Sequence, residues 1–168
     1  MNISDKQLLK LKKLLSETPL ANLDELEQIR LHAPGVFHSE KAYDENAFFV
    51  TRYSLHYKPI NDFLSKLTNW DAKHMTTLHH IHYIEGSKAR EHVDASDLTC
   101  VIMMDNQSEG GEFLFNKKPM RFQDPGEYMI YKGSSLHEVK PLTSGIRDVL
   151  VVWYRKNVDN TISNKSII

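Results

Sequence analysis

The sequence predicts one α+β domain in which helices precede a sandwich or jelly roll of β-strands. The chain has 168 residues, enough for one domain with a sizeable core and too few for two ordinary domains. Before Trp70 the apolar residues follow helical spacing, whereas after it short β-rich runs alternate with turn residues. No helical segment separates those runs, which disfavours a parallel βαβ arrangement.

The N-terminal segment carries two helix signals. Residues 4–7 (Ser-Asp-Lys-Gln) have the pattern of a capping box, and a helical stripe follows it at Leu8, Leu11 and Leu15. This predicts an amphipathic helix that ends near Pro19. Asn22 and Glu25 repeat the capping pattern ahead of a second stripe that residues 33–35 (Ala-Pro-Gly) end, which predicts a second helix.

The pattern from residue 43 to residue 67 is mixed. Residues 47–50 (Ala-Phe-Phe-Val) suit either a strand or a buried turn of helix, and Pro59 interrupts what precedes it. We expect helix on both sides of Pro59. Residues 1–70 would then form a helical support packed on one sheet.

The second part of the chain predicts the jelly-roll core, at residues 74–156, followed by a tail at 157–168. We expect strands at residues 76–84, 98–104, 112–115, 120–123, 128–131, 137–140 and 146–154. We expect turns at residues 105–111, 116–119 and 124–126. In the last strand Arg147 shares a face with apolar residues at positions 149, 151 and 153, and a buried arginine needs a partner. A carboxylate ligand inside the barrel is therefore expected.

Composition narrows the classes of partner and compartment. Lys and Arg number 21 against 22 Asp and Glu and are interleaved, so we expect no nucleic-acid partner. The single cysteine, Cys100, lies in an apolar run and is expected to be a buried thiol. No apolar run approaches the roughly 20 residues of a membrane span, and the N-terminus lacks a signal-peptide pattern. We expect a cytoplasmic protein without a membrane partner, and the sequence indicates no oligomeric state.

Three residues have the types and spacing of a metal site. In an extended strand His92 and Asp94 point to the same face, and His137 would supply a second imidazole. Two histidines and one carboxylate on one side of a metal form the facial triad of non-haem iron(II) oxygenases, although zinc accepts the same ligands. Arg147, ten residues after His137, would hold one end of a dicarboxylic acid and favours iron with a keto acid over zinc.

A longer series of motifs carries a family resemblance. From Tyr83 to Tyr154 the chain contains, in order, Tyr83-Ile84-Glu85-Gly86, His92-Val93-Asp94, Leu98-Thr99, Gly110-Gly111-Glu112-Phe113, Leu136-His137-Glu138-Val139, Gly145-Ile146-Arg147 and Val152-Trp153-Tyr154. In this order and at these spacings the chain resembles the iron(II)- and 2-oxoglutarate-dependent oxygenases, specifically their prolyl-hydroxylase-like branch. The resemblance implies a double-stranded β-helix, another name for the jelly roll, behind the N-terminal helices.

The resemblance also implies cofactors and a reaction. His92, Asp94 and His137 would bind Fe(2+), Arg147 would bind the far carboxylate of 2-oxoglutarate, dioxygen would be consumed, and ascorbate could support activity. The product would be a hydroxylated C–H bond, because Asp94 is present where halogenating relatives have a small residue. A peptidyl proline is the expected substrate. The alternatives are a free amino acid or small metabolite, and a module that binds metal and keto acid without turnover.

Two further positions concern the keto acid. Many relatives have a tyrosine beside the arginine at the position that corresponds to Met103, so a second donor to the carboxylate must come from elsewhere. Tyr83 and Thr99 are the candidates, with Tyr83 preferred. Other branches have the pattern Arg-x-Ser, where this chain has Arg147-Asp148-Val149, which argues against those branches. Trp153 is expected to be a core residue.

His79, His80 and His82 form a second histidine cluster. Strand parity puts His80 and His82 on one face and His79 on the other, and no acid or cysteine lies near them at ligand spacing. We therefore expect packing rather than a second metal site, with one of the three histidines at the mouth of the pocket.

Overall fold

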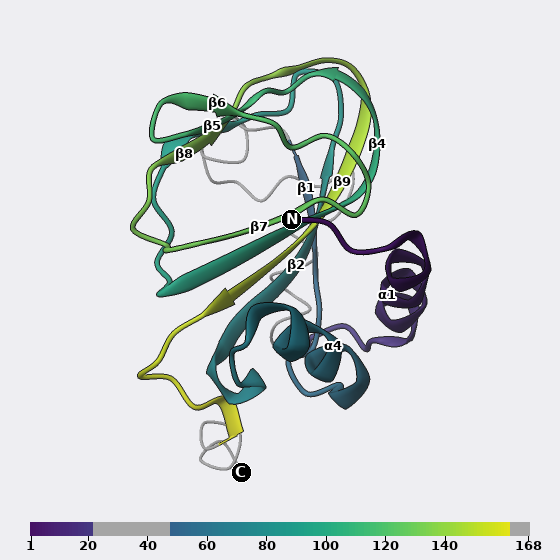
Figure 1. Ribbon diagram of the computed structural model, residues 1–168, viewed down its shortest axis with the longest axis vertical. Helices are drawn as coiled ribbons and strands as arrows, with labels where there is room; N and C mark the ends of the chain where they lie inside the picture. Colours follow the sequence, from purple (N-terminus) through teal and green to yellow (C-terminus); the bar gives the residue numbers. More distant parts are fainter. Residues whose placement is uncertain (22–47, 162–168) are drawn as a thin grey trace.

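The fold consists of two antiparallel sheets that face each other. The computed structural model describes residues 1–21 and 48–161 (Figure 1). The larger sheet has the order β1 (Phe49–Arg52), β2 (Met75–Tyr83), β9 (Leu142–Tyr154), β4 (Leu98–Gly110), β7 (Tyr128–Tyr131). The smaller sheet has the order β3 (Ala89–His92), β8 (His137–Val139), β5 (Phe113–Phe115), β6 (Lys118–Met120). This arrangement confirms the predicted α+β jelly roll.

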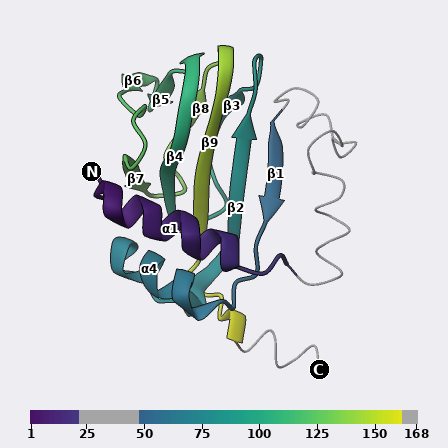
Figure 2. The same ribbon diagram turned by 90° about the vertical axis from the view of Figure 1, so that its right-hand side faces the viewer.

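Two helices and a short 3-10 helix, η1 (Ala72–His74), support the larger sheet. Helix α1 (Asp5–Glu17) begins at Ser4, whose Oγ accepts a hydrogen bond from the Gln7 backbone N–H at 3.1 Å, as the capping pattern predicts. Helix α4 (Lys58–Thr68) has a proline in its first turn and ends at Asn69 in the left-handed region, φ 59°. Figure 2 shows both helices lying across the outer face of the larger sheet. The helix predicted at residues 22–33 lies outside the described residues.

The larger sheet is buried on both faces. Its outer face packs on the helices through a core that includes Leu11, Ile60, Leu64, Leu78, Ile102, Leu150 and Tyr154. Its inner face meets the smaller sheet through a second core that includes Val50, Ile81, Val101, Met103, Phe113, Leu142 and Val151. Because β4 and β9 are covered on both sides, their central residues are continuously apolar rather than alternating. Among the described helices, none is long and apolar enough to cross a membrane.

The prediction of helix before Pro59 is wrong. Phe49 to Arg52 form strand β1, which pairs antiparallel with His79 to His82 at the edge of the larger sheet. The pairing joins residues about thirty positions apart, so local apolar spacing could not reveal it. The helix predicted after Pro59 is confirmed, and it begins at Lys58, with Pro59 in its first turn.

Three boundaries in the β-region also differ from prediction. Strand β9 begins at Leu142 rather than at residue 146. Strand β4 continues through the predicted turn as far as Gly110, because residues 105–110 pair with β9. Strand β6 occupies residues 118–120, not 120–123, because Asn116 and Lys117 both have positive φ and close a tight hairpin. Pro119 fits there because β6 is an edge strand.

Candidate metal and carboxylate site

A cavity of about 430 Å³ lies between the two sheets. The smaller sheet and the segment that follows β3 contribute His92, Asp94, Phe113, His137 and Val139 to its wall. The larger sheet contributes His79, Ile81, Tyr83, Val101, Tyr131, Arg147, Val149, Val151 and Trp153. The prediction that residues 147, 149, 151 and 153 share an inward face is confirmed, since all four line the cavity. A largely apolar wall thus surrounds a few polar side chains.

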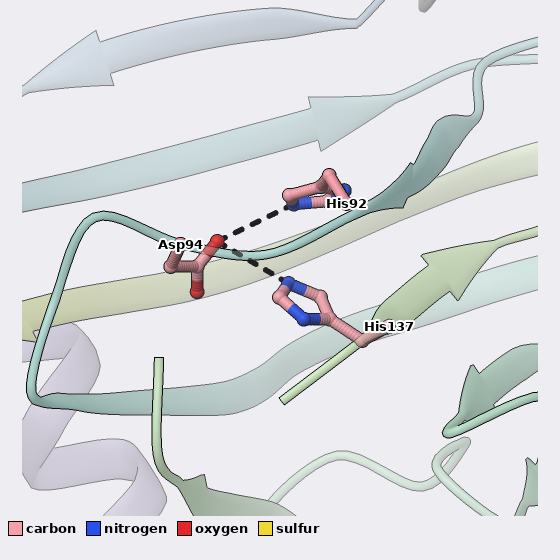
Figure 3. Close-up of side chains that lie close together, drawn as sticks. All are labelled: His92, Asp94 and His137. Carbon is pink, nitrogen blue, oxygen red and sulfur yellow. Dashed lines mark ion pairs between the residues drawn. The ribbon is translucent and has the colours of Figure 1, made fainter. Parts of the chain in front are cut away.

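Two histidines meet across neighbouring strands of the smaller sheet. His92 is the last residue of β3 and His137 is the first of β8, and the two form a cross-strand pair with ring centroids 4.2 Å apart. Asp94 lies just beyond β3, with Oδ1 3.3 Å from Nε2 of each histidine (Figure 3). One ligand atom from each of the three residues lies within 4.8 Å of the others. They can therefore converge on one metal ion.

Backbone carbonyls orient both imidazoles toward this point. His137 Nδ1 lies 2.9 Å from the Ser135 carbonyl oxygen, and His92 Nδ1 contacts the carbonyl oxygen of Arg90. A proton on each Nδ1, donated to its carbonyl, would leave each Nε2 free to bind a metal held beside Asp94. This is the tautomer that a metal-binding histidine needs.

Asp94 is held from both its backbone and its side chain. Its backbone N–H donates to the Gly133 carbonyl at 2.8 Å, and its Oδ2 accepts from Thr99 Oγ1 at 2.8 Å. Burial alone would raise the pKa of Asp94, but contacts with His137 and His92 and the Thr99 hydrogen bond lower it below its ordinary value. The carboxylate is therefore ionised at neutral pH, as a metal ligand must be.

The three side chains differ in exposure, which leaves the site open on one side. The side chains of Asp94 and His137 are 8% and 6% exposed, whereas that of His92 is 43% exposed. Among residues 1–21 and 48–161, this is the one group of histidine, cysteine, aspartate and glutamate side chains arranged to hold a metal. An ion there would keep coordination positions free toward the cavity.

Arg147 lies in the same cavity, 4% exposed, opposite Tyr83 on the neighbouring strand. Its Nη1 donates to the Gly111 carbonyl at 2.7 Å and its Nη2 to the Gly110 carbonyl at 3.2 Å. Its Nε is buried and has no hydrogen-bond partner in the described part of the chain. Burial lowers the pKa of Arg147 and raises that of Tyr83 to about 12, so the tyrosine keeps its proton as a donor. A buried donor without an acceptor among the described residues is available to a ligand in the cavity.

Two residues near the site lie differently from what the sequence indicated. Thr99 does not line the cavity, and its hydroxyl bonds Asp94 and Ser96 instead of facing Arg147. Tyr131, which the sequence did not single out, does line the cavity, with its ring 4.9 Å from that of His137. Burial raises the pKa of Tyr131, and the negative charge of Asp94 raises it further. Its strand was predicted, but the face of a short strand that turns inward is not evident from sequence.

The second histidine cluster divides between the two faces of β2. His79 lines the cavity and meets Trp153 edge-on at 5.1 Å. His80 Nε2 and His82 Nδ1 lie on the other face, 2.8 and 2.7 Å from Asp148 Oδ1. Asp148 lies 66 positions from His82 in the chain, outside any ligand spacing, and antiparallel pairing brings the two opposite each other.

Comparisons with known proteins agree with this geometry. No family model matches the chain. A PKHD-type hydroxylase of Colwellia psychrerythraea is 29% identical over 82 residues, which cover 46% of this chain and 37% of the relative. The chain therefore matches little more than a third of that relative's length.

Solved structures share the fold at low sequence identity. A viral collagen prolyl hydroxylase from Paramecium Bursaria Chlorella virus-1 has a TM-score of 0.56 at 14% identity, covering 87% of this chain and 89% of its own. An oxidoreductase of the 2OG-Fe(II) oxygenase family from Burkholderia pseudomallei has a TM-score of 0.53 at 15% identity, covering 82% and 80%. Together with the curated relative, these similarities confirm the resemblance that the motifs indicated.

Proposed function

We propose that this chain is an iron(II)- and 2-oxoglutarate-dependent oxygenase of the prolyl-hydroxylase-like branch that hydroxylates a C–H bond, expected to be that of a peptidyl proline. One observation carries the proposal. A two-histidine, one-carboxylate cluster and a buried arginine with an unpaired N–H line the same cavity. The first suits a metal with open coordination positions, and the second suits an acid beside it.

The donor set fits iron(II). His92 and His137 direct Nε2 toward Asp94, each Nδ1 faces a backbone carbonyl, and Asp94 is ionised, so three ligands of the facial type are in place. Zinc would accept the same ligands, and the buried arginine distinguishes the two cases. Arg147 favours iron with a keto acid, because it offers a fixed carboxylate-binding fork in the same cavity.

The arginine fits 2-oxoglutarate. With iron(II) bound, this keto acid supplies two electrons for dioxygen chemistry as it is converted to succinate. On the protein side, Arg147 would bind the far carboxylate with its remaining N–H groups, and the Tyr83 hydroxyl would donate from the neighbouring strand. Met103, which is fully buried in the core, supplies no donor.

The remaining wall residues exclude water and position the substrate. Ile81, Val101 and Val149 surround the polar groups with apolar surface, which strengthens the electrostatic attraction between Arg147 and an acid. The exposed side of the site, beside His92, is where a substrate would enter. No side chain has to act as an acid or base, since hydrogen removal belongs to the cofactor chemistry.

A peptidyl proline is proposed because the structurally similar viral protein is described as a collagen prolyl hydroxylase. A free amino acid or another small metabolite is the alternative, because either could undergo the same chemistry in this cavity. A non-catalytic module that binds metal and keto acid is the third candidate.

Succinate formation tests the reaction class. Purified protein with iron(II), 2-oxoglutarate, ascorbate and air should release succinate even without its substrate, and His137→Ala should release none. Peptides and free amino acids are then screened by mass spectrometry for the gain of one oxygen atom. Succinate at the level of a metal-free control, with no candidate raising it, would leave the binding module as the better description.

A further inference from the structure

We propose that Gly110 and Gly111 are positioning residues for Arg147: their carbonyl oxygens seat the guanidinium and fix the direction in which it meets a carboxylate. This inference rests on the proposed function, because it concerns how the acid is bound. We call these two glycines the arginine seat. The seat joins the end of β4 to the start of β5, and so lies between the two sheets.

The contact between the seat and Arg147 is close and specific. The two carbonyls accept from Nη1 and Nη2 at 2.7 and 3.2 Å. A Cβ on Gly111 would lie 2.6 Å from Nη2, 2.8 Å from Nη1 and 2.7 Å from Leu142 Cδ1, so a side chain there would press on the guanidinium and on Leu142 together. Both glycines also have positive φ, 73° and 64°, which other residues rarely adopt. Only glycine allows the arginine to rest directly on the backbone.

Because the two acceptors of the seat are uncharged carbonyl oxygens, the positive charge of Arg147 stays available to attract an anionic ligand. The described residues provide no acidic side chain in ion-pair contact with Arg147, although it is 4% exposed. A carboxylate partner would orient the arginine equally well, but it would neutralise the charge and compete with a ligand. Backbone carbonyls fix the geometry at two of the five guanidinium N–H groups. Nε–H and one N–H on each terminal nitrogen remain to bind a carboxylate.

The seat is itself anchored, so it can restrain a long side chain. The Gly111 N–H donates to the Pro141 carbonyl at 3.1 Å, and the Lys140 N–H donates to the Glu112 carbonyl at 2.9 Å. Pro141 immediately precedes β9, the strand that carries Arg147. The arginine and its seat are thus tied to the same stretch of backbone, and the guanidinium is preorganised before a ligand arrives.

Gly111→Ala tests the seat, with Gly86→Ala as the matched control. Gly86 has a φ of 85°, but an added methyl group would meet no atom within 4 Å, so its substitution carries similar backbone strain without touching Arg147. Affinity for 2-oxoglutarate is measured by calorimetry on manganese(II)-loaded protein, and manganese(II) affinity by electron paramagnetic resonance. Gly111→Ala should weaken 2-oxoglutarate binding roughly tenfold or more while changing metal affinity little, and Gly86→Ala should resemble wild type.

A double mutant separates positioning from general damage. In an Arg147→Ala background, Gly111→Ala should cause no further loss of 2-oxoglutarate affinity, because the group on which it acts is gone. Equal losses in both backgrounds, or an unchanged affinity in Gly111→Ala alone, would overturn the seat.

Nuclear magnetic resonance of the wild-type protein tests the same point without a glycine variant, should Gly111→Ala fail to fold. The Arg147 Nη–H signals, assigned by their loss in Arg147→Lys, should be separate and protected before any ligand is added. The Nε–H signal should shift when 2-oxoglutarate is added. Averaged Nη signals in the free protein would contradict the seat. Failure of the wild type to bind 2-oxoglutarate would instead contradict the proposed function, while the Nη signals still decide the seat.

Discussion

The Thr99 hydroxyl donates to Asp94 Oδ2 at 2.8 Å, while Asp94 Oδ1 faces the two histidines at 3.3 Å. Of the two carboxylate oxygens, Oδ2 is therefore held by the Thr99 hydrogen bond, while Oδ1 faces the proposed metal position. Thr99 is fully buried and is joined to Ser96 Oγ at 2.7 Å, so it cannot easily turn away. This arrangement favours binding of a metal through Oδ1 alone.

Thr99→Val is expected to weaken iron(II) binding by roughly 10- to 100-fold, because it removes the hydrogen bond that orients the carboxylate while keeping the shape of the side chain. Thr99→Ser should restore most of the affinity, since the hydroxyl returns. Metal titration of the two variants in parallel provides the measurement. Equal affinities for valine and serine would show that the hydroxyl has no part in holding Asp94.

His137→Ala should abolish iron-dependent succinate formation while the protein stays folded, because the ring is one of three proposed ligands and lines a cavity rather than the helix-side core. Asp94→Glu should be milder than Asp94→Ala, since a carboxylate remains, displaced by one methylene group. Succinate release and circular dichroism are compared across the three variants. Full activity of His137→Ala would remove the metal site as described.

Arg147→Ala should weaken 2-oxoglutarate binding by roughly ten- to a few-hundredfold, the loss expected for a charge-assisted contact of about 1.5 to 3 kcal/mol. Arg147→Lys should fall between alanine and wild type, because an ammonium keeps the charge without the planar fork. The absorbance band of the anaerobic iron complex reports the affinity. Since Arg147 is not a proposed ligand, iron affinity serves as the internal control.

Tyr83→Phe and Tyr131→Phe form a pair that identifies the second donor to the carboxylate. Tyr83 lies opposite Arg147, whereas the Tyr131 ring packs against His137. Tyr83→Phe should therefore weaken 2-oxoglutarate binding roughly tenfold and Tyr131→Phe much less. Because the pKa of Tyr83 is about 12, wild-type affinity should show no loss from this hydroxyl between pH 6 and 9. The reverse order of the two variants would reassign the donor to Tyr131.

Asp148→Asn should destabilise the fold at pH 7 by about 1 to 3 kcal/mol, because the Asp148 carboxylate lies within hydrogen-bond distance of ring nitrogens of both His80 and His82. Burial opposes ionisation, but those two histidines lower the pKa of Asp148 below its unfolded value, which is near 3.9. The stabilisation is thus present above about pH 4 and is lost as the pH falls through the folded-state pKa. Chemical denaturation at several pH values measures this change.

The control for that experiment is Asp105→Asn, which removes an ion pair with Lys12. The Asp105 side chain is 57% exposed and the Lys12 side chain 37% exposed. Such a surface pair is worth about 0 to 1 kcal/mol, so the variant should unfold nearly like wild type. A difference between Asp148→Asn and wild type that persists undiminished at pH 2 would point to packing rather than charge.

Sequence predicted the parts of the fold that depend on local patterns. The cap at Ser4, the strand at 128–131 and the inward face of β9 follow from spacing over a few residues and are confirmed. Strand β1 and the far half of β4 exist because of partners distant in the chain. No local pattern distinguishes their residues from a helix turn or a polar loop.

The residues of the site likewise divide into those that a sequence motif predicted and those that it did not. His92, Asp94, His137 and Arg147 were singled out by motif, and the structure brings them into one cavity. Tyr131, the Asp94-directed role of Thr99 and the seat of Arg147 depend on which strands become neighbours. Tyr131 lies opposite Thr99 because β7 pairs with β4, the Thr99–Asp94 contact joins β4 to the segment after β3, and the seat joins β9 to the β4–β5 turn. None of the three has a signature in sequence spacing.

The contact of Asp148 with His80 and His82 also bears on strand register. Arg147 and Asp148 are consecutive in β9, one facing the cavity and the other the helices. If β9 slipped by one residue against both β2 and β4, the two side chains would exchange faces, which would move the guanidinium out of the cavity and a carboxylate into it. A slip of two residues would restore the faces but carry Arg147 about 7 Å along the strand from its contact with Gly111. His80 and His82 both contact Asp148 in the native alignment, so these contacts favour the register that keeps Arg147 in the cavity.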